Sequence, residues 1–188
     1  REQNEGRLFT FNDVVSSSNS TSVIMRNILC CNNSSDNEQW YDYPNFLTIF
    51  KKSGYDVYFW DNQKDVAKTA TFSFTLNSFL YDSKMCEISY TQINDKSYQY
   101  DEEIVKSYKD DVVLKNKCNL VLFHLMGQHI AAIERFPHDK FTYFTVDSIK
   151  REASYLGDTE RKQIADYDNA TLYNDYVMNE IFDTFRNS

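Results

Sequence analysis

Thr21 follows a serine-rich run, residues 16–20, at the point where apolar side chains begin to recur at helical spacing. Ser20 or Thr21 is therefore the natural N-cap of the predicted helix. Free N–H groups and the positive end of the helix dipole would surround the Thr21 hydroxyl and stabilise an anionic phosphoryl oxygen. A threonine alkoxide could attack phosphorus if a metal ion lowered its pKa, which would form a covalent phosphoenzyme. The alternative is that Ser20 or Thr21 only caps the helix.

Two of the three histidines lie at the end of an apolar run, residues 119–126. His124 is inside the run and is predicted to be a core histidine bonded to backbone. His129 follows Gly127 where the predicted strand ends, and could donate to a phosphate or take part in proton transfer there. His138 is predicted to be solvated.

A polar cluster, Asp61, Asn62 and Gln63, ends the predicted strand over residues 55–60. These side chains could supply amide donors to a ligand headgroup, or they could form a turn that closes the strand. The acids at 101–103 are predicted to start a helix. The four cysteines have no metal-ligand spacing and leave the redox compartment open.

Helix and strand alternate around these positions. Helical spacing predicts helices from residue 21, over 43–53, from 101 and over about 158–185, and apolar runs predict strands over 8–15, 55–60 and 119–126. Residues 72–79 fit either element, and 141–156 are predicted to be a polar connection. This order predicts one α/β domain of three layers, in which helices flank a mostly parallel sheet. Ligands of such sheets collect beyond the carboxyl ends of the strands.

Composition limits the partners. The 188 residues are 41% apolar, which suits one globular domain with a substantial core. The net charge of −8 argues against nucleic acid, because phosphate contact needs clustered Lys and Arg. No apolar stretch reaches the ~20 residues of a membrane span, and no signal peptide is present, so the chain as given is expected to be soluble. Because it starts without Met, we expect it to be an excised piece of a longer protein.

Several segments, in this order, resemble the catalytic domain of the phosphoethanolamine transferases, membrane enzymes of the sulfatase and alkaline-phosphatase superfamily. They are FNDVVSSSNSTSVIMRNIL (11–29), FLTIFKKSGYDVYFWDNQ (46–63), YDEEIV (100–105), LFHLMGQHIAAIERFP (122–137) and YDNATLYNDYVMNEIF (167–182). The resemblance covers most of the chain. It implies a single, partial sulfatase-like catalytic domain over residues 1–188.

The resemblance also implies an activity: transfer of phosphoethanolamine from a phospholipid donor to lipid A or a lipopolysaccharide core sugar through a phosphothreonine. Thr21 would be the phosphoryl acceptor and a zinc ligand. Asn62, Gln63 and His129 would contact the phosphoethanolamine or its donor lipid. His124 would be part of the hydrophobic core. Transmembrane helices on the amino-terminal side would anchor the whole protein in the inner membrane, with this domain facing the periplasm.

The chain departs from the family pattern in two respects. Gln128 replaces the usual serine before His129, and Ile130 replaces the Gly or Pro that often follows. The metal-binding Glu of the family precedes the matching region, and its Asp-His pair and later His follow it. Zinc is thus implied for the full-length enzyme, whereas this chain is predicted to hold no tight metal and to be inactive alone.

Two other functions stay open. A sulfatase-like hydrolase needs a Cys or Ser followed by x-Pro-x-Arg, and the chain has no such run. A non-catalytic α/β binding module would use its aromatic surfaces to recognise a partner, with Thr21 as a cap only.

Overall fold

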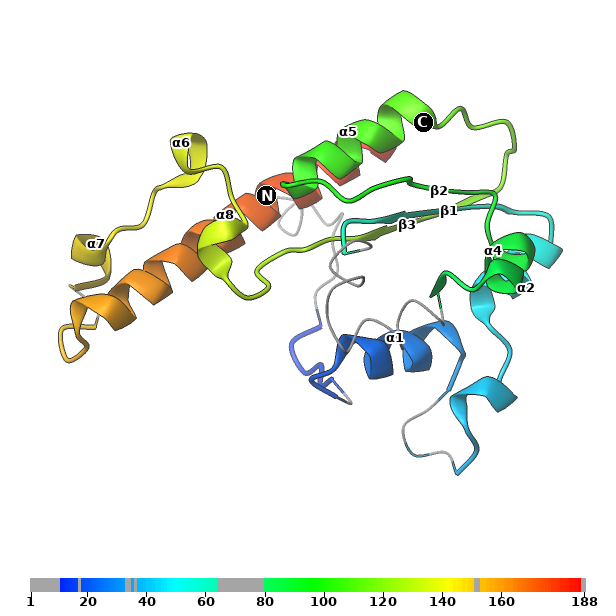
Figure 1. The fold of residues 1–188 in the computed structure, drawn as a ribbon, viewed down its shortest axis with the longest axis horizontal. Helices are drawn as coiled ribbons and strands as arrows, with labels where there is room; N and C mark the ends of the chain where they lie inside the picture. The colour runs from blue at the N-terminus through cyan, green and yellow to red at the C-terminus, as the bar shows by residue number, and fades with distance from the viewer. Residues whose placement is uncertain are drawn as a thin grey trace.

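The computed structural model describes residues 11–16, 18–32, 35, 37–63, 80–150 and 153–186. Figure 1 shows the arrangement of the helices and strands. Their order is α1 (Thr21–Leu29), η1 (Trp40–Asp42), α2 (Phe46–Lys52), β1 (Asp56–Asp61), α4 (Ser83–Ser89), β2 (Gln92–Ile93), α5 (Asp101–Asp111), β3 (Asn119–His124), η3 (Ala132–Glu134), α6 (His138–Phe141), α7 (Val146–Lys150) and α8 (Asp158–Arg186).

The described strands form one sheet in the order β2-β1-β3. Strand β1 is parallel to both neighbours, and its pairing with β3 runs from Asp56 opposite Asn119 to Asp61 opposite His124. All carboxyl ends therefore meet at one edge, which confirms the predicted parallel sheet. Because Asp61 and His124 are register partners, the residues that follow β1 and β3 leave the sheet side by side.

Side chains of β1 alternate between two cores, which places helices on both faces of the sheet. Val57 and Phe59 pack with Leu29 of α1 and Leu47 of α2. Their neighbours Tyr58 and Trp60 face the other way and pack against α5 and α8. Figure 1 shows the same division, with α5 above the strands, α1 below them, and α8 running diagonally from the left of the view up to α5. The predicted three-layer α/β architecture is confirmed.

Helix α8 has 29 residues and packs along α5, α6, α7 and η3. Small or aromatic side chains line its buried face, including Ala170, Tyr173 and Val177. The Tyr173 hydroxyl accepts a hydrogen bond from the Glu102 amide at 3.0 Å, which ties α8 to the first turn of α5. Charged residues recur along α8, and among the described residues no helix has the length and apolar content to cross a bilayer.

Several elements differ from the prediction. Residues 11–16 of the expected first strand have no regular structure, and Val15 is 87% exposed; residues 8–10 and 72–79 lie outside the described part of the chain. The expected polar connection over 141–156 contains α7. Strand β2, of two residues, was not predicted. Strand β3 is at the edge of the described sheet, and its side chains are half-buried.

Candidate functional site

The carboxylate of Asp101 organises the edge at which β1 and β3 end. It is 3% exposed at the first position of α5. Its Oδ1 accepts from Asn62 Nδ2 at 2.7 Å and from the Met126 amide at 2.9 Å, and its Oδ2 accepts from the Gly127 amide at 2.8 Å. One side chain thus joins the turn after β1, the start of α5 and the loop after β3.

Asn62 and Gln63 both lie in this turn, but they present different groups. Asn62 is 1% exposed, and its Oδ1 also accepts from the Tyr98 amide at 2.6 Å. A headgroup contact by Asn62 would therefore require its bonds to Asp101 or Tyr98 to open. Gln63 is half-buried and donates through Nε2 to the Leu125 carbonyl at 2.8 Å. Gln63 thus links the two exit loops while remaining partly accessible to solvent.

His129 is exposed on the loop after β3. Gly127 makes the turn with φ of +55°, in the left-handed region that favours glycine. The His129 amide donates to the Met126 carbonyl at 3.2 Å, and the Arg135 guanidinium donates to the carbonyls of His129 and Ile130 at 3.2 and 2.8 Å. The backbone of the loop is therefore held from both sides while the imidazole stays accessible.

Thr21 is the first residue of α1, as predicted, and Ser20 occupies the N-cap position. The Ser20 hydroxyl does not cap the helix, because it bonds the Ser22 hydroxyl at 3.0 Å. The first turn also carries no acidic residue. Thr21 therefore lies at a helix N-terminus whose positive end is not neutralised by its own side chains.

A second buried carboxylate, Asp61 at the end of β1, is 1% exposed. Its Oδ1 lies 2.9 Å from His124 Nδ1 and accepts from the Gln63 amide at 2.7 Å, while Oδ2 accepts from the Tyr81 hydroxyl. Burial, and then the charge and hydrogen bond of Asp61, raise the pKa of the Tyr81 phenol, so it remains a neutral donor. The expectation that His124 bonds backbone is wrong, because its partner is this carboxylate. His138 is exposed, as predicted.

The structure brings together the predicted residues of the two strand exits, and it leaves Thr21 on a separate element. No hydrogen bond or ion pair between described residues joins Thr21 to Gln63 or His129. Helix α1 lies below the sheet in Figure 1, with its first turn directed toward the side where the strands end.

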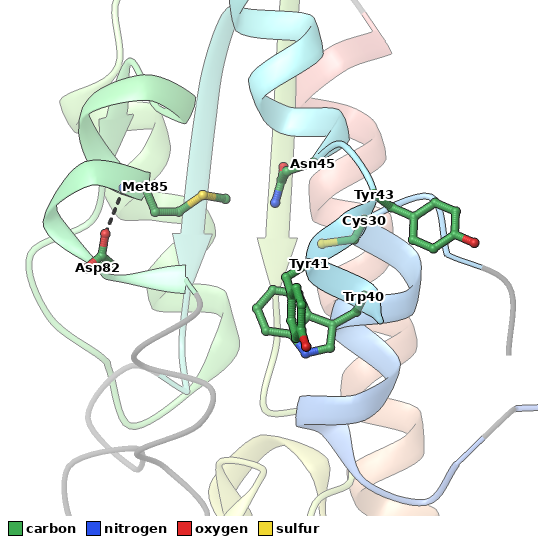
Figure 2. A pocket seen from close by; sticks show the side chains of 7 residues that line it. All are labelled: Cys30, Trp40, Tyr41, Tyr43, Asn45, Asp82 and Met85. Atoms are coloured by element: carbon green, nitrogen blue, oxygen red, sulfur yellow. Dashed lines mark hydrogen bonds between the residues drawn. The ribbon is translucent and has the colours of Figure 1, made fainter. Parts of the chain in front are cut away.

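An open pocket of about 280 Å³ lies away from these residues (Figure 2). Its walls come from the end of α1, the η1 segment and α4; they are Cys30, Trp40, Tyr41, Tyr43, Asn45, Asp82 and Met85. The Arg26 guanidinium already lies over the Trp40 ring, 5.0 Å from its centroid. None of the predicted site residues lines this pocket, and we assign it no part in the site.

The described side chains do not offer a complete set of zinc ligands. Among the described residues, no three or more His, Cys, Asp or Glu side chains are grouped closely enough to share a metal ion. Asp61 and Asp101 already accept protein donors. Four ligands are usual for zinc, so the described residues do not make a zinc site by themselves.

Sequence reasoning named Asp61, Asp101 and His124 but missed that Asp61 holds His124 and that Asp101 joins the two exit loops. Most partners of these side chains are distant in the chain, as in the bonds from Tyr81 and His124 to Asp61, which span 20 and 63 positions. One signal was available, since an acid directly after an apolar strand is placed at the edge where ligands of parallel sheets bind.

Comparison with known proteins supports this description. The model of the sulfatase family matches residues 3–188. The chain is 26% identical over 181 residues to the phosphoethanolamine transferase EptC of Escherichia coli O18:K1:H7 (strain RS218 / NMEC), covering 95% of this chain and 30% of that protein.

Two solved structures of the C-terminal periplasmic domain of EcEptC from Escherichia coli share the fold. The first superposes with a TM-score of 0.70 at 24% identity and covers 94% of this chain and 47% of the solved chain. The second, a complex with Zn, has a TM-score of 0.69 at 24% identity, with coverage of 93% and 48%. Because the family model spans nearly all of the sequence, this chain belongs to the sulfatase family.

Proposed function

We propose that this chain is part of the catalytic domain of a membrane-anchored phosphoethanolamine transferase. The full-length protein would move phosphoethanolamine from a phospholipid to lipid A or a lipopolysaccharide core sugar. Likeness to the EptC transferases over 95% of the chain supports the reaction class. The solved neighbours are described as periplasmic domains, which supports a location at the periplasmic face of the inner membrane, with the anchor on the amino-terminal side.

The observation that carries the proposal is the uncapped first turn of α1 at Thr21. A phosphoryl group there would meet unneutralised helix N–H groups and the positive end of the dipole. In the first half-reaction, the bond from Thr21 Oγ to phosphorus forms as the bond from phosphorus to the diacylglycerol oxygen breaks. In the second, a sugar hydroxyl attacks the phosphothreonine and releases Thr21.

The exit loops of β1 and β3 would contact the phosphoethanolamine group of the donor lipid. Gln63 and His129 have accessible side chains there, and Asp101 fixes both loops. Asn62 would act at the same position, with its amide turned from Asp101 toward the ligand.

The full-length enzyme is proposed to bind zinc, because an EptC domain was solved in complex with Zn. Thr21 is the one ligand proposed from this chain, and zinc bound there would lower the pKa of the hydroxyl. The purified 188-residue chain is expected to carry no tight metal and to be inactive. Stoichiometric zinc measured by mass spectrometry would contradict that expectation.

The test replaces Thr21 in the full-length protein. Thr21→Ala should abolish transfer and the covalent adduct, while wild-type enzyme quenched in acid during turnover should carry a phosphoethanolamine mass on the peptide that contains Thr21. Ser22→Ala, which removes a neighbouring hydroxyl of the same turn, is the matched control and should keep both. Unchanged transfer by Thr21→Ala would instead favour a non-catalytic binding module in which the threonine is a helix residue only.

A further inference from the structure

His124 is held in one orientation by a carboxylate that solvent does not reach. The Nδ1 to Oδ1 distance to Asp61 is 2.9 Å, and the two side chains are 15% and 1% exposed. The Gln63 amide and the Tyr81 hydroxyl occupy other acceptor positions of the same carboxylate. All these partners approach Asp61 as hydrogen-bond donors, so we place the hydrogen between Asp61 and His124 on Nδ1.

This orientation determines what the opposite nitrogen can do. A neutral imidazole with its hydrogen on Nδ1 carries a free lone pair on Nε2. No described residue forms a hydrogen bond with Nε2 of His124. The Asp61 carboxylate, 2.9 Å from Nδ1, would also stabilise the imidazolium that forms when Nε2 takes a proton. The pair is therefore built to receive and return a proton at Nε2.

The position of His124 adds a second observation. It is the last residue of β3 and the register partner of Asp61, so it lies at the carboxyl edge of the sheet. The Asn62 amide donates to the His124 carbonyl at 2.8 Å, which places the residue beside the turn that carries Gln63. An ionic network buried only for stability has little advantage over apolar side chains of the same volume.

We propose that His124 is a proton-transfer residue of this site, and that Asp61 positions it; the inference rests on the transferase function proposed above. As the sugar oxygen bonds to phosphorus and the bond from phosphorus to Thr21 breaks, Nε2 takes the proton of the sugar hydroxyl. Thr21 leaves as its alkoxide and keeps no proton, so it attacks the next donor directly while Nε2–H gives the sugar's proton to the departing diacylglycerol oxygen. Each cycle returns the imidazole to its starting state.

The test compares two donors in the full-length enzyme. Diacylglycerol oxygen is a poor leaving group that needs a proton, whereas p-nitrophenolate leaves without one. His124→Gln should lower the release of diacylglycerol from phosphatidylethanolamine about 100-fold, as loss of a general acid does. The burst of p-nitrophenolate from p-nitrophenyl phosphoethanolamine should fall less than about threefold. Asp61→Asn should show the same split to a smaller degree.

The controls separate this inference from the proposed function. His138→Gln changes an exposed histidine and should leave both donors unaffected. Thr21→Ala should eliminate both. If both donors survive in Thr21→Ala, the proposed function fails. If Thr21→Ala is inactive but His124→Gln lowers both donors equally, or neither, only the inference about His124 fails.

A measurement on wild-type enzyme covers the case in which His124→Gln does not fold. A series of aryl phosphoethanolamines with increasingly basic phenols should give a shallow dependence of burst rate on phenol pKa, because the enzyme protonates the leaving oxygen. A dependence as steep as that of the uncatalysed reaction would overturn the proposal.

Discussion

Replacing Asp101 by Asn should destabilise the whole domain although it changes only one atom of the side chain. The carboxylate accepts from the Asn62 side chain and from the Met126 and Gly127 amides, at 2.7, 2.9 and 2.8 Å. An asparagine has one acceptor oxygen, so in either rotamer its NH₂ group faces at least one N–H of this cluster. Each buried donor left without a partner costs about 1–3 kcal/mol.

The bonds that survive in Asp101→Asn also lose the charge that strengthened them. We therefore expect the free energy of unfolding to fall by about 2–4 kcal/mol. That is a large part of the roughly 5–15 kcal/mol by which domains of this kind are stable. Urea unfolding followed by the fluorescence of Trp60, which is 0% exposed, measures the change.

The matched control is Asp110→Asn, the same chemical change at an exposed position of α5, which should cost less than about 0.5 kcal/mol. Hydrogen exchange adds a local measurement, since the Met126 and Gly127 amides should lose protection before the rest of β3. The reasoning is refuted if Asp101→Asn matches the control in urea and both amides keep their wild-type exchange rates.

Three further predictions use other buried polar groups. Burial raises the pKa of the Cys30 thiol to about 11, so at pH 8 only about one molecule in a thousand carries its thiolate. Mass spectrometry after treatment with iodoacetamide should therefore find the exposed Cys31 and Cys118 alkylated, and Cys30 unmodified until the chain unfolds. The Tyr108 hydroxyl is buried without a hydrogen-bond partner among the described residues, so Tyr108→Phe should raise the free energy of unfolding by about 1 kcal/mol. Tyr173→Phe removes the bond from the Glu102 amide and should lower the free energy of unfolding by about 1 kcal/mol. Equal effects of the two variants in thermal unfolding would contradict this. Asn169→Ala leaves the Tyr143 and Phe144 amides and the Phe144 carbonyl without their native partner, and should lower the free energy of unfolding by about 2–4 kcal/mol. Asn179→Ala, on the exposed face of α8, is the control and should lower it by less than about 0.5 kcal/mol in the same urea assay.

Patterns confined to one stretch of sequence predicted the elements well. The strand predicted at 55–60 is β1 at Asp56–Asp61, and the helix predicted at about 158–185 is α8 at Asp158–Arg186. Both signals are local, since a run of large apolar side chains or a helical period exists before any tertiary contact forms. The start of α1 at Thr21 was predicted for the same reason, because a helix start is a local feature.

Features that depend on distant partners were not predictable in this way. In α8 the apolar Leu172 is 39% exposed, while the polar Asn169 is 1% exposed because it bonds the backbone of residues 143 and 144. Residues 11–15 have strand-like composition, but no described strand pairs with them. The roles of Asp61 and Asp101 likewise become visible only when the exits of β1 and β3 are side by side.

These two buried carboxylates bear directly on how an anionic substrate could approach a chain whose net charge is −8. Bare carboxylates at the carboxyl edge of the sheet would repel a phosphate. Each is instead surrounded by N–H and O–H donors, supplied to Asp101 by the exit loops and to Asp61 by Gln63, Tyr81 and His124. Their negative ends are therefore turned into the protein, where they fix the loops. Among the described residues, the imidazole of His129 and the amide of Gln63 stay accessible at this edge and can donate to a phosphoryl oxygen, as can Nε2 of His124 once it has taken a proton.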